Sequence, residues 1–214
     1  HEKRYTDYTF DCYVRLIGKV VVCEGPSGGG ATSILPGVVE ANESSIPILA
    51  ITTDIAVSSR GKYTLTEMDQ EGLFRPITKW NKVIDRADEL PGVFRTAFRN
   101  MTSGRPGAAH IGLPFDVQRA PVARSQVYGD AALGVFPSRR IGADPDSIRA
   151  AADALLSAKE PMFVCGSGPV IAGAEAELAA IAELVEAPVA STVSGHGVIA
   201  DDHPLAVGVV GSNG

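Results

Sequence analysis

Short apolar runs alternating with helix-patterned segments constrain the fold of this chain more than any other feature. Residues 20–23, 46–51 and 108–113 are apolar along most of their length, as buried strands are. Between the last two runs, apolar residues recur at helical spacing and predict an amphipathic helix over residues 87–102. A further helix is predicted over residues 31–42, after a glycine-rich turn. Continuous apolar strands separated by helices are typical of an α/β fold with a parallel sheet covered on both faces.

A second α/β unit is predicted from residue 146 onwards. A helix near Ile148, a strand at 162–165, a glycine turn, a helix at 174–185 and a strand from Pro188 form a Rossmann-like beginning. The proline-rich stretch before it predicts a linker, residues 119–145, that lies along a surface. We therefore expect domains at 1–118 and 146–214. Both are expected to be incomplete, because a doubly wound sheet usually has about five or six strands, and the sequence is interpreted as a fragment.

Charge and composition exclude some classes of function. The net charge of −6 disfavours nucleic acid as a partner, because phosphate binding needs a basic face. No apolar run approaches the roughly 20 residues of a membrane span, so no membrane partner is expected. Cys12, Cys23 and Cys165 have no metal-ligand spacing and are predicted to be buried thiols in a reducing, cytoplasmic compartment. No metal ligands are predicted within this chain.

Several motifs follow one another along nearly the whole chain, and their order is more specific than any one of them. These motifs are His1-Glu2, residues 15–19, Gly28 to Thr32, Ser45 to Glu67, Arg75 to Asn81, Thr102 to Gln118, Gly166 to Gly168, Pro188 to Ser194 and Asp202 to Gly208. Together they resemble the large-subunit acetolactate synthase family of thiamine-diphosphate-dependent enzymes. The resemblance implies most of a pyrimidine-binding domain followed by the first part of a Rossmann-like central domain.

The resemblance implies a catalytic role for Glu2. The matching glutamate of the family hydrogen-bonds the N1′ atom of the cofactor's aminopyrimidine, which is general acid–base chemistry that needs a carboxyl group with a raised pKa. The gap from Glu2 to Tyr13 is one residue longer than in the family. A solvated glutamate near the chain terminus is the alternative.

Two further segments match family positions that line the cofactor and the substrate entrance. Gly28, Gly29 and Gly30 would let the backbone approach a planar ring, although an ordinary strand-to-helix turn is equally consistent with them. The second segment contains Thr66 and Glu67. In this segment Leu65-Thr66 replaces the family's Phe-Gln, and Asp54 and Ala56 replace Gln and Pro. A surface carboxylate is the alternative for Glu67, and the replacements leave the substrate open.

The remaining candidates are positions that contact FAD in flavin-containing members of the family. Arg105 suits a phosphate or a flavin edge, with a cation at a helix C-terminus as the alternative. In the second domain the candidate residues are Gly166, Gly168, Thr192, Val193 and Ser194. His110 is interpreted as a satisfied core histidine and His196 as a surface residue.

The resemblance implies an activity and its requirements. The parent enzyme would use thiamine diphosphate and Mg²⁺, with the diphosphate and metal site on a domain absent from this chain, and FAD is possible. It would decarboxylate a 2-keto acid and join the product to a second carbonyl, giving acetolactate and CO₂ from pyruvate. A homodimer or homotetramer would follow. The alternatives are another 2-keto acid decarboxylase, carboligase or oxidase, a non-catalytic homologue, or a plain nucleotide-binding module.

Overall fold

A computed structural model describes residues 13–124, 127 and 129–211 of the 214-residue chain. Two sequence predictions, those for Glu2 and Cys12, concern residues outside this range. The chain divides into two compact units, unit 1 at His1–Arg139 and unit 2 at Arg140–Gly214, and each is described by itself.

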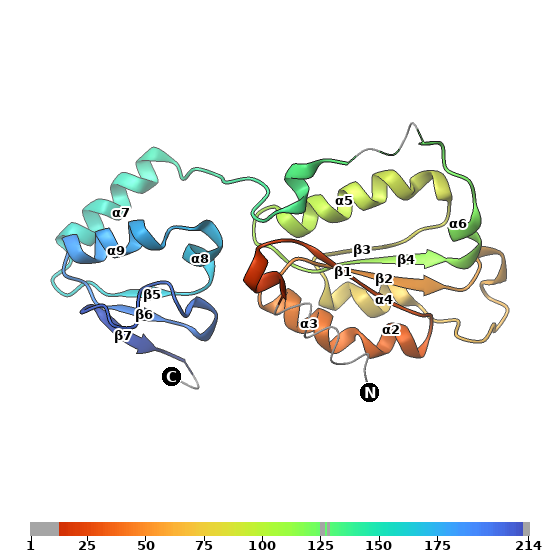
Figure 1. Ribbon diagram of the computed structural model, residues 1–214, viewed down its shortest axis with the longest axis horizontal. Coiled ribbons are helices and arrows are strands. Elements are labelled where there is room, and N and C mark those ends of the chain that lie inside the picture. The colour runs from red at the N-terminus through yellow and green to blue at the C-terminus, as the bar shows by residue number, and fades with distance from the viewer. Residues whose placement is uncertain (1–12, 125–126, 128, 212–214) are drawn as a thin grey trace. The chain divides into compact units, whose positions relative to one another are not determined.

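Unit 1 is built on a parallel sheet of four strands, as the apolar runs predict (Figure 1). The strands are β1 (Val21–Gly25), β2 (Ile48–Asp54), β3 (Trp80–Val83) and β4 (Ala109–Pro114), in the spatial order β1-β2-β4-β3. Every pairing is parallel. The carboxyl ends of all four strands therefore meet at one edge of the sheet, which we call the carboxyl edge of unit 1.

Helices cover both faces of this sheet. One face is covered by α2 (Gly29–Ser33), α3 (Leu35–Glu43) and α4 (Gln70–Phe74), and the other by α5 (Leu90–Thr102) and α6 (Phe115–Arg119) (Figure 1). Successive residues of β2 serve the two cores, because side chains alternate along a strand: Ile48 packs with the first group of helices and Leu49 with the second. The predicted α/β fold with a doubly covered sheet is confirmed.

Two predicted elements of unit 1 differ in detail. The single helix expected over 31–42 is two helices, because Pro36 stands at the start of α3, where its missing N–H is tolerated and its ring prevents continuation of α2. The first strand was expected to be buried, but β1 lies at the edge of the sheet and Val22 is 46% exposed.

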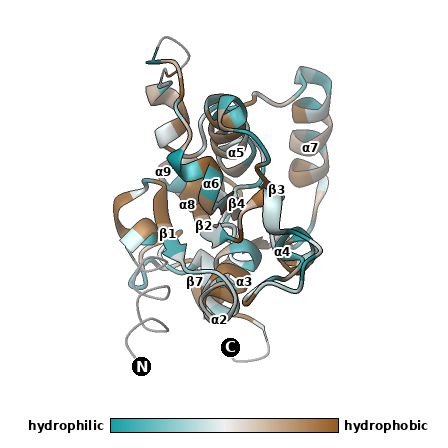
Figure 2. Cartoon of the chain, turned by 90° about the vertical axis from the view of Figure 1, so that its right-hand side faces the viewer, coloured by the Kyte–Doolittle hydropathy of each residue, from teal (hydrophilic) through white to brown (hydrophobic). Residues whose placement is uncertain are grey.

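The helix predicted from apolar spacing between the second and third runs is α5. Its Ala97 and Met101 are fully buried against the sheet, and Figure 2 shows brown and teal residues side by side along it, as expected of an amphipathic helix. The chain after α6 returns over α5 through a short 3₁₀ helix, Ala131–Gly134, whose last carbonyl accepts a hydrogen bond from the Val20 N–H.

Unit 2 has a parallel sheet of three described strands, in the order β5-β6-β7, and is α/β as predicted. Its elements are α7 (Pro145–Ser157), β5 (Phe163–Cys165), α8 (Gly168–Ala172), α9 (Glu175–Leu184), β6 (Val189–Ser191) and β7 (Ala206–Val209). The Asp144 carboxylate caps α7 by accepting a hydrogen bond from the Ser147 N–H. Ala182 of α9 and Val189 of β6 are buried in its core.

Three single-residue predictions can be checked on this fold. Cys23 and Cys165 are buried, as expected. The side chain of His196 is 61% exposed, which confirms it as a surface residue. Within the described ranges, no helix combines the length and the apolar character that a membrane span needs.

Candidate functional site

The carboxyl edge of unit 1 brings together two of the predicted site segments. The turn with Gly28 follows β1, and a segment of residues 55–69, which carries Thr66 and Glu67, follows β2. The two strands are parallel neighbours in register, with Gly25 paired to Thr52, so the segments that follow them leave the sheet at the same edge. Ligands of open α/β sheets bind at this edge.

The glycine turn and Thr66 are in contact. The Ser27 hydroxyl lies 2.9 Å from Thr66 Oγ1 and 3.2 Å from the Thr66 carbonyl oxygen, to which it can donate. Gly28 has φ +66°, and a Cβ placed on it would lie only 2.9 Å from Thr66 Cβ. Thr66 itself has φ +71°, which is uncommon for a residue other than glycine. The contact therefore depends on a glycine at position 28.

The three glycines of the turn have different surroundings. A Cβ on Gly30 would overlap the ring of Pro26, at 2.3 Å from its Cγ, so Gly30 serves the packing of the turn. Gly29 is different, because no atom of the described residues lies within 4 Å of its Cβ position. Gly29 therefore leaves bare backbone facing open space beside the Gly28–Thr66 contact, where a planar ring could approach.

The Glu67 side chain is hydrogen-bonded to the backbone of its own loop. Its carboxylate accepts hydrogen bonds from the N–H groups of Gly61 and Thr64. It also lines an open cavity of about 470 Å³ together with Gly61, Tyr63 and Thr64. The structure thus gives Glu67 a structural role in the loop and leaves it facing a cavity.

Arg105 lies at the opposite edge of the sheet. Its Nη2 donates to the Glu43 carbonyl at 2.8 Å and its Nε to Ser45 Oγ at 2.9 Å, at the C-terminus of α3. β4 begins just after it, at Ala109, so Arg105 stands by the amino ends of the strands, away from the glycine turn. Within unit 1 it stabilises the last carbonyls of a helix, as a cation there should.

The candidate residues of unit 2 also converge at the carboxyl edge of their sheet. Gly166 and Gly168 follow β5, and the Thr192 N–H donates to the Cys165 carbonyl at 2.8 Å. Val193 and Ser194 lie on a 3₁₀ helix, Val193–Gly195. Sequence reasoning missed Gly195, whose Cβ would lie 2.3 Å from the Cys165 carbonyl oxygen. Its position directly after the Thr-Val-Ser stretch was the available signal.

Sequence reasoning also missed a buried polar chain behind the carboxyl edge of unit 1. His110, Thr52 and Gln70 are buried, and Thr52 Oγ1 lies 2.7 Å from His110 Nε2. The Thr52 hydroxyl donates to Gln70 Oε1, so its oxygen accepts from His110, whose proton is therefore on Nε2. Gln70 Nε2 in turn donates to Asp54 Oδ1 at 3.2 Å. The same Gln70 Nε2 donates to the Thr53 carbonyl at 2.8 Å.

His110 is a core histidine, as predicted, but it is satisfied on one side only. Its ring stacks on Phe74 with centroids 3.7 Å apart. Among the described residues Nδ1 has no hydrogen-bond partner. Burial lowers the pKa of His110 to about 3, so the ring is neutral at physiological pH.

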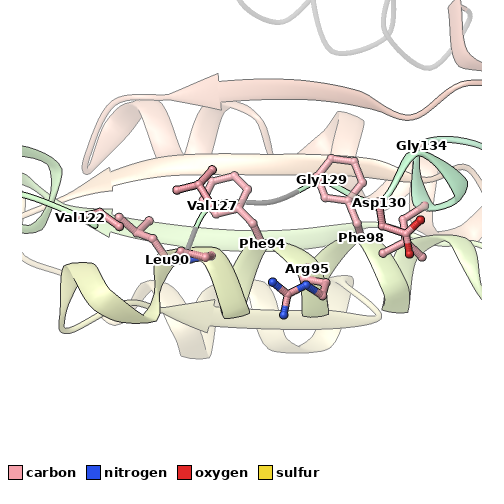
Figure 3. Close-up of a pocket in the computed structure, with 11 residues that line it drawn as sticks. Leu90, Phe94, Arg95, Phe98, Val122, Val127, Gly129, Asp130 and Gly134 are labelled. Carbon is pink, nitrogen blue, oxygen red and sulfur yellow. The ribbon is translucent and has the colours of Figure 1, made fainter. Parts of the chain in front are cut away.

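A further cavity is separate from these segments. It measures about 530 Å³ and lies between α5 and residues 122, 127 and 129–134, with Phe94 and Phe98 directed toward Val127 and Gly129 (Figure 3). None of the predicted site residues that the structure describes lines it.

Comparisons with known proteins match both units. Residues 9–73 match the family described as "Thiamine pyrophosphate enzyme, N-terminal TPP binding domain". Residues 148–214 match "Thiamine pyrophosphate enzyme, central domain".

Curated relatives extend the similarity over almost the whole chain. A "probable acetolactate synthase large subunit" of Methanococcus aeolicus is 39% identical over 95% of this chain and 34% of its own length. The acetolactate synthase isozyme 1 large subunit of Escherichia coli K12 is 34% identical over 94% of this chain and 34% of its own length. A glyoxylate carboligase of Escherichia coli O157:H7 is 35% identical over 91% of this chain and 32% of its own length. The chain thus spans about a third of the length of these relatives.

A solved structure shows the same fold. The X-ray structure of a presumed thiamin diphosphate-dependent enzyme isolated from Mycobacterium smegmatis superposes with a TM-score of 0.86, at 21% identity, covering 98% of this chain and 40% of that one.

Proposed function

The chain belongs to the thiamine pyrophosphate enzyme family, and from this premise we propose that the protein to which it contributes decarboxylates a 2-keto acid and joins the product to a second carbonyl compound. Acetolactate formation from pyruvate is the reaction we favour, because relatives named acetolactate synthase match over 94–95% of the chain. Thiamine diphosphate and Mg²⁺ are the proposed cofactors. The diphosphate and metal site would lie outside this chain, which spans about a third of its relatives.

The observation that carries this proposal is the contact of Gly28 with Thr66 beside the bare backbone of Gly29. Bare backbone at a carboxyl edge suits the approach of a flat aminopyrimidine ring. When bound, thiamine diphosphate supplies a carbon nucleophile and an electron sink. The chain's own residues would orient that ring, exclude water and hold a proton next to it. We assign the proton to the Glu2 carboxyl, which lies outside the described residues.

A second candidate reaction is carboligation of glyoxylate. The glyoxylate carboligase relative is 35% identical to this chain, as similar as the E. coli acetolactate synthase at 34%. This chain also has Leu65-Thr66 where the acetolactate synthase pattern has Phe-Gln, and these positions would face the substrate. A different 2-keto acid, or loss of catalysis with retention of binding, would be compatible with the same replacements.

We extend the proposal to the wider assembly and to a flavin. The pairing of a pyrimidine-binding domain with a diphosphate domain of another subunit would make the protein a homodimer or homotetramer. FAD would contact Gly166, Gly168 and the stretch from Thr192 to Ser194, which converge at the carboxyl edge of unit 2. Purified protein that binds flavin would absorb in the yellow flavin band.

Calorimetric titration of the full-length protein with thiamine diphosphate and Mg²⁺ tests the proposal directly. Saturable binding, followed by CO₂ release from pyruvate rather than glyoxylate, is the expected result. Saturable binding with CO₂ release from glyoxylate alone would favour the second candidate. Absence of binding would refute the thiamine proposal for this protein, and binding without turnover of any 2-keto acid would show a non-catalytic homologue.

A further inference from the structure

The exposed part of the 55–69 segment is held by polar contacts rather than by apolar packing. Tyr63 is 99% exposed and Leu65 is 89% exposed. Tyr63 and Thr66 both have positive φ, a conformation that persists in residues other than glycine only where the surroundings impose it. Some other interaction must therefore fix the segment where Thr66 meets the glycine turn.

Arg60 supplies a cross-link from this segment to two strands. Its Nη1 lies 2.5 Å from Asp85 Oδ1 and its Nη2 lies 3.5 Å from Asp54 Oδ2. Asp54 is the last residue of β2, and Asp85 follows the end of β3 at Val83. Because β4 lies between β2 and β3 in the sheet, the guanidinium spans the carboxyl end of β4. A planar fork suits this double contact, which one ammonium group reproduces poorly.

The Asp54 end of this bridge is anchored in the core. The Asp54 side chain is only 6% exposed and accepts hydrogen bonds from the Ile55 N–H at 2.8 Å and from Gln70 Nε2. Burial raises the pKa of Asp54, while the Ile55 N–H, Arg60 and Gln70 act in the opposite direction. Removal of one partner from such a pair leaves a buried charge uncompensated, which costs more than the loss of a pair between two exposed charges.

We propose that Arg60 is a positioning residue: by bridging Asp54 and Asp85 it fixes the 55–69 segment, and so holds Thr66 and Glu67 beside the glycine turn. The acetolactate synthase pattern has Gln in place of Asp54, so the bridge is a departure of this chain from that pattern. The bridge stands on the contacts described here. Only its effect on substrate binding rests on the proposed function.

Hydrogen–deuterium exchange of the cofactor-free protein tests the bridge itself. Arg60→Leu is expected to raise amide exchange in residues 55–69 by about tenfold or more, because exchange of a loop follows its local opening. Asp54→Asn keeps the shape and removes the charge, and it should act in the same direction. Arg86→Leu is the matched control, since it breaks an exposed pair with Asp88 elsewhere in unit 1. Exchange in 55–69 unchanged by Arg60→Leu, or unchanged by Asp54→Asn, would overturn the proposal.

Kinetics of the full-length protein, loaded with thiamine diphosphate and Mg²⁺, test the consequence. Arg60→Leu is expected to lower kcat/KM about 100-fold, chiefly by raising KM for the 2-keto acid, because displacement by about 1 Å can have this effect. Arg60→Lys should recover part of the loss. Arg86→Leu should leave kcat/KM unchanged. A fall in kcat at constant KM, in proportion to folded protein, would refute positioning. Lack of cofactor binding by the unaltered protein would refute the proposed function instead, and the exchange result would still decide the bridge.

Discussion

Substitution of Gly28 by alanine measures how strongly the Gly28–Thr66 contact depends on glycine. The backbone at Gly28 has φ +66° and ψ −117°, a sparsely populated conformation that costs an L-residue about 1–3 kcal/mol. The added Cβ would also lie 2.9 Å from Thr66 Cβ and 3.0 Å from Thr66 Cγ2, and overpacking of this kind costs about 1–3 kcal/mol. The two costs together predict a loss of about 2–6 kcal/mol in the free energy of unfolding of unit 1.

Gly29→Ala is the matched control, because it adds the same methyl group one residue further on. The Cβ would meet no atom of the described residues within 4 Å, and Gly29 begins α2 with an ordinary helical backbone. Replacement of glycine by alanine at a compatible site stabilises a folded protein by about 0.4–1 kcal/mol, because it reduces the conformational entropy of the unfolded chain. The free energy of unfolding should therefore stay equal or rise slightly.

Urea unfolding of the two variants decides the stability part of this prediction. A midpoint lowered for Gly28→Ala and unchanged or raised for Gly29→Ala is the expected pattern. Equal stability of the two variants would refute the geometry of the turn. In the full-length protein, Gly29→Ala should bind thiamine diphosphate more weakly than the unaltered protein does if the cofactor ring lies against Gly29. This loss of affinity is expected although Gly29→Ala is the more stable of the two variants. Unchanged affinity would remove Gly29 from the proposed site.

Three further predictions address the acid–base groups and unit 2. His110 has a folded pKa of about 3 against an ordinary value near 6.5, so the stability that it contributes is present above pH 6.5 and is lost as the pH falls toward 3. The free energy of unfolding should therefore drop by about 2 kcal/mol between pH 7 and pH 5. His110→Leu should abolish this share of the drop, whereas His196→Asn should leave it unchanged. Glu2→Gln should abolish turnover of the intact enzyme, and near-normal activity would exclude the role given to Glu2. Gly195→Ala should lower the unfolding free energy of unit 2 by about 2–3 kcal/mol, since its Cβ would overlap the Cys165 carbonyl, whereas Gly168→Ala should have little effect; similar urea midpoints would contradict the close approach.

The sheet and its layers could be predicted because burial leaves a simple record in the sequence. β2 and β4 are central strands, and both appear as continuous apolar runs. β3 was missed, since its residues Trp-Asn-Lys-Val are only half-buried at the edge of the sheet and form neither an apolar run nor an alternating pattern. The break between α2 and α3 could have been foreseen from Pro36, which helical periodicity alone ignores.

The candidate site was predictable only in part, because its contacts join distant residues. The sequence predicts a glycine turn, but nothing local indicates that Gly28 contacts Thr66, which lies 38 residues later. The resemblance to a family supplied both segments and grouped Arg105 with them as a cofactor residue. Within unit 1 the structure places Arg105 at the other edge of the sheet, a distinction that follows from strand direction and not from spacing.

The buried polar chain connects the fold to the proposed site more directly than any single motif does. Thr52 and His110 lie on neighbouring strands that the apolar pattern predicts to be uniformly hydrophobic, and a buried polar group there is costly unless it is hydrogen-bonded. Apart from His110 Nδ1, which has no partner among the described residues, the chain meets that requirement from His110 Nε2 through Thr52 and Gln70, and it ends on Asp54 at the carboxyl edge. Since the Gln70 amide donates both to the Thr53 carbonyl and to Asp54 Oδ1, the buried chain contributes one hydrogen bond to the carboxylate at that edge. Departures from the apolar rule are expected where function imposes them, and here they lead to the carboxylate that Arg60 bridges.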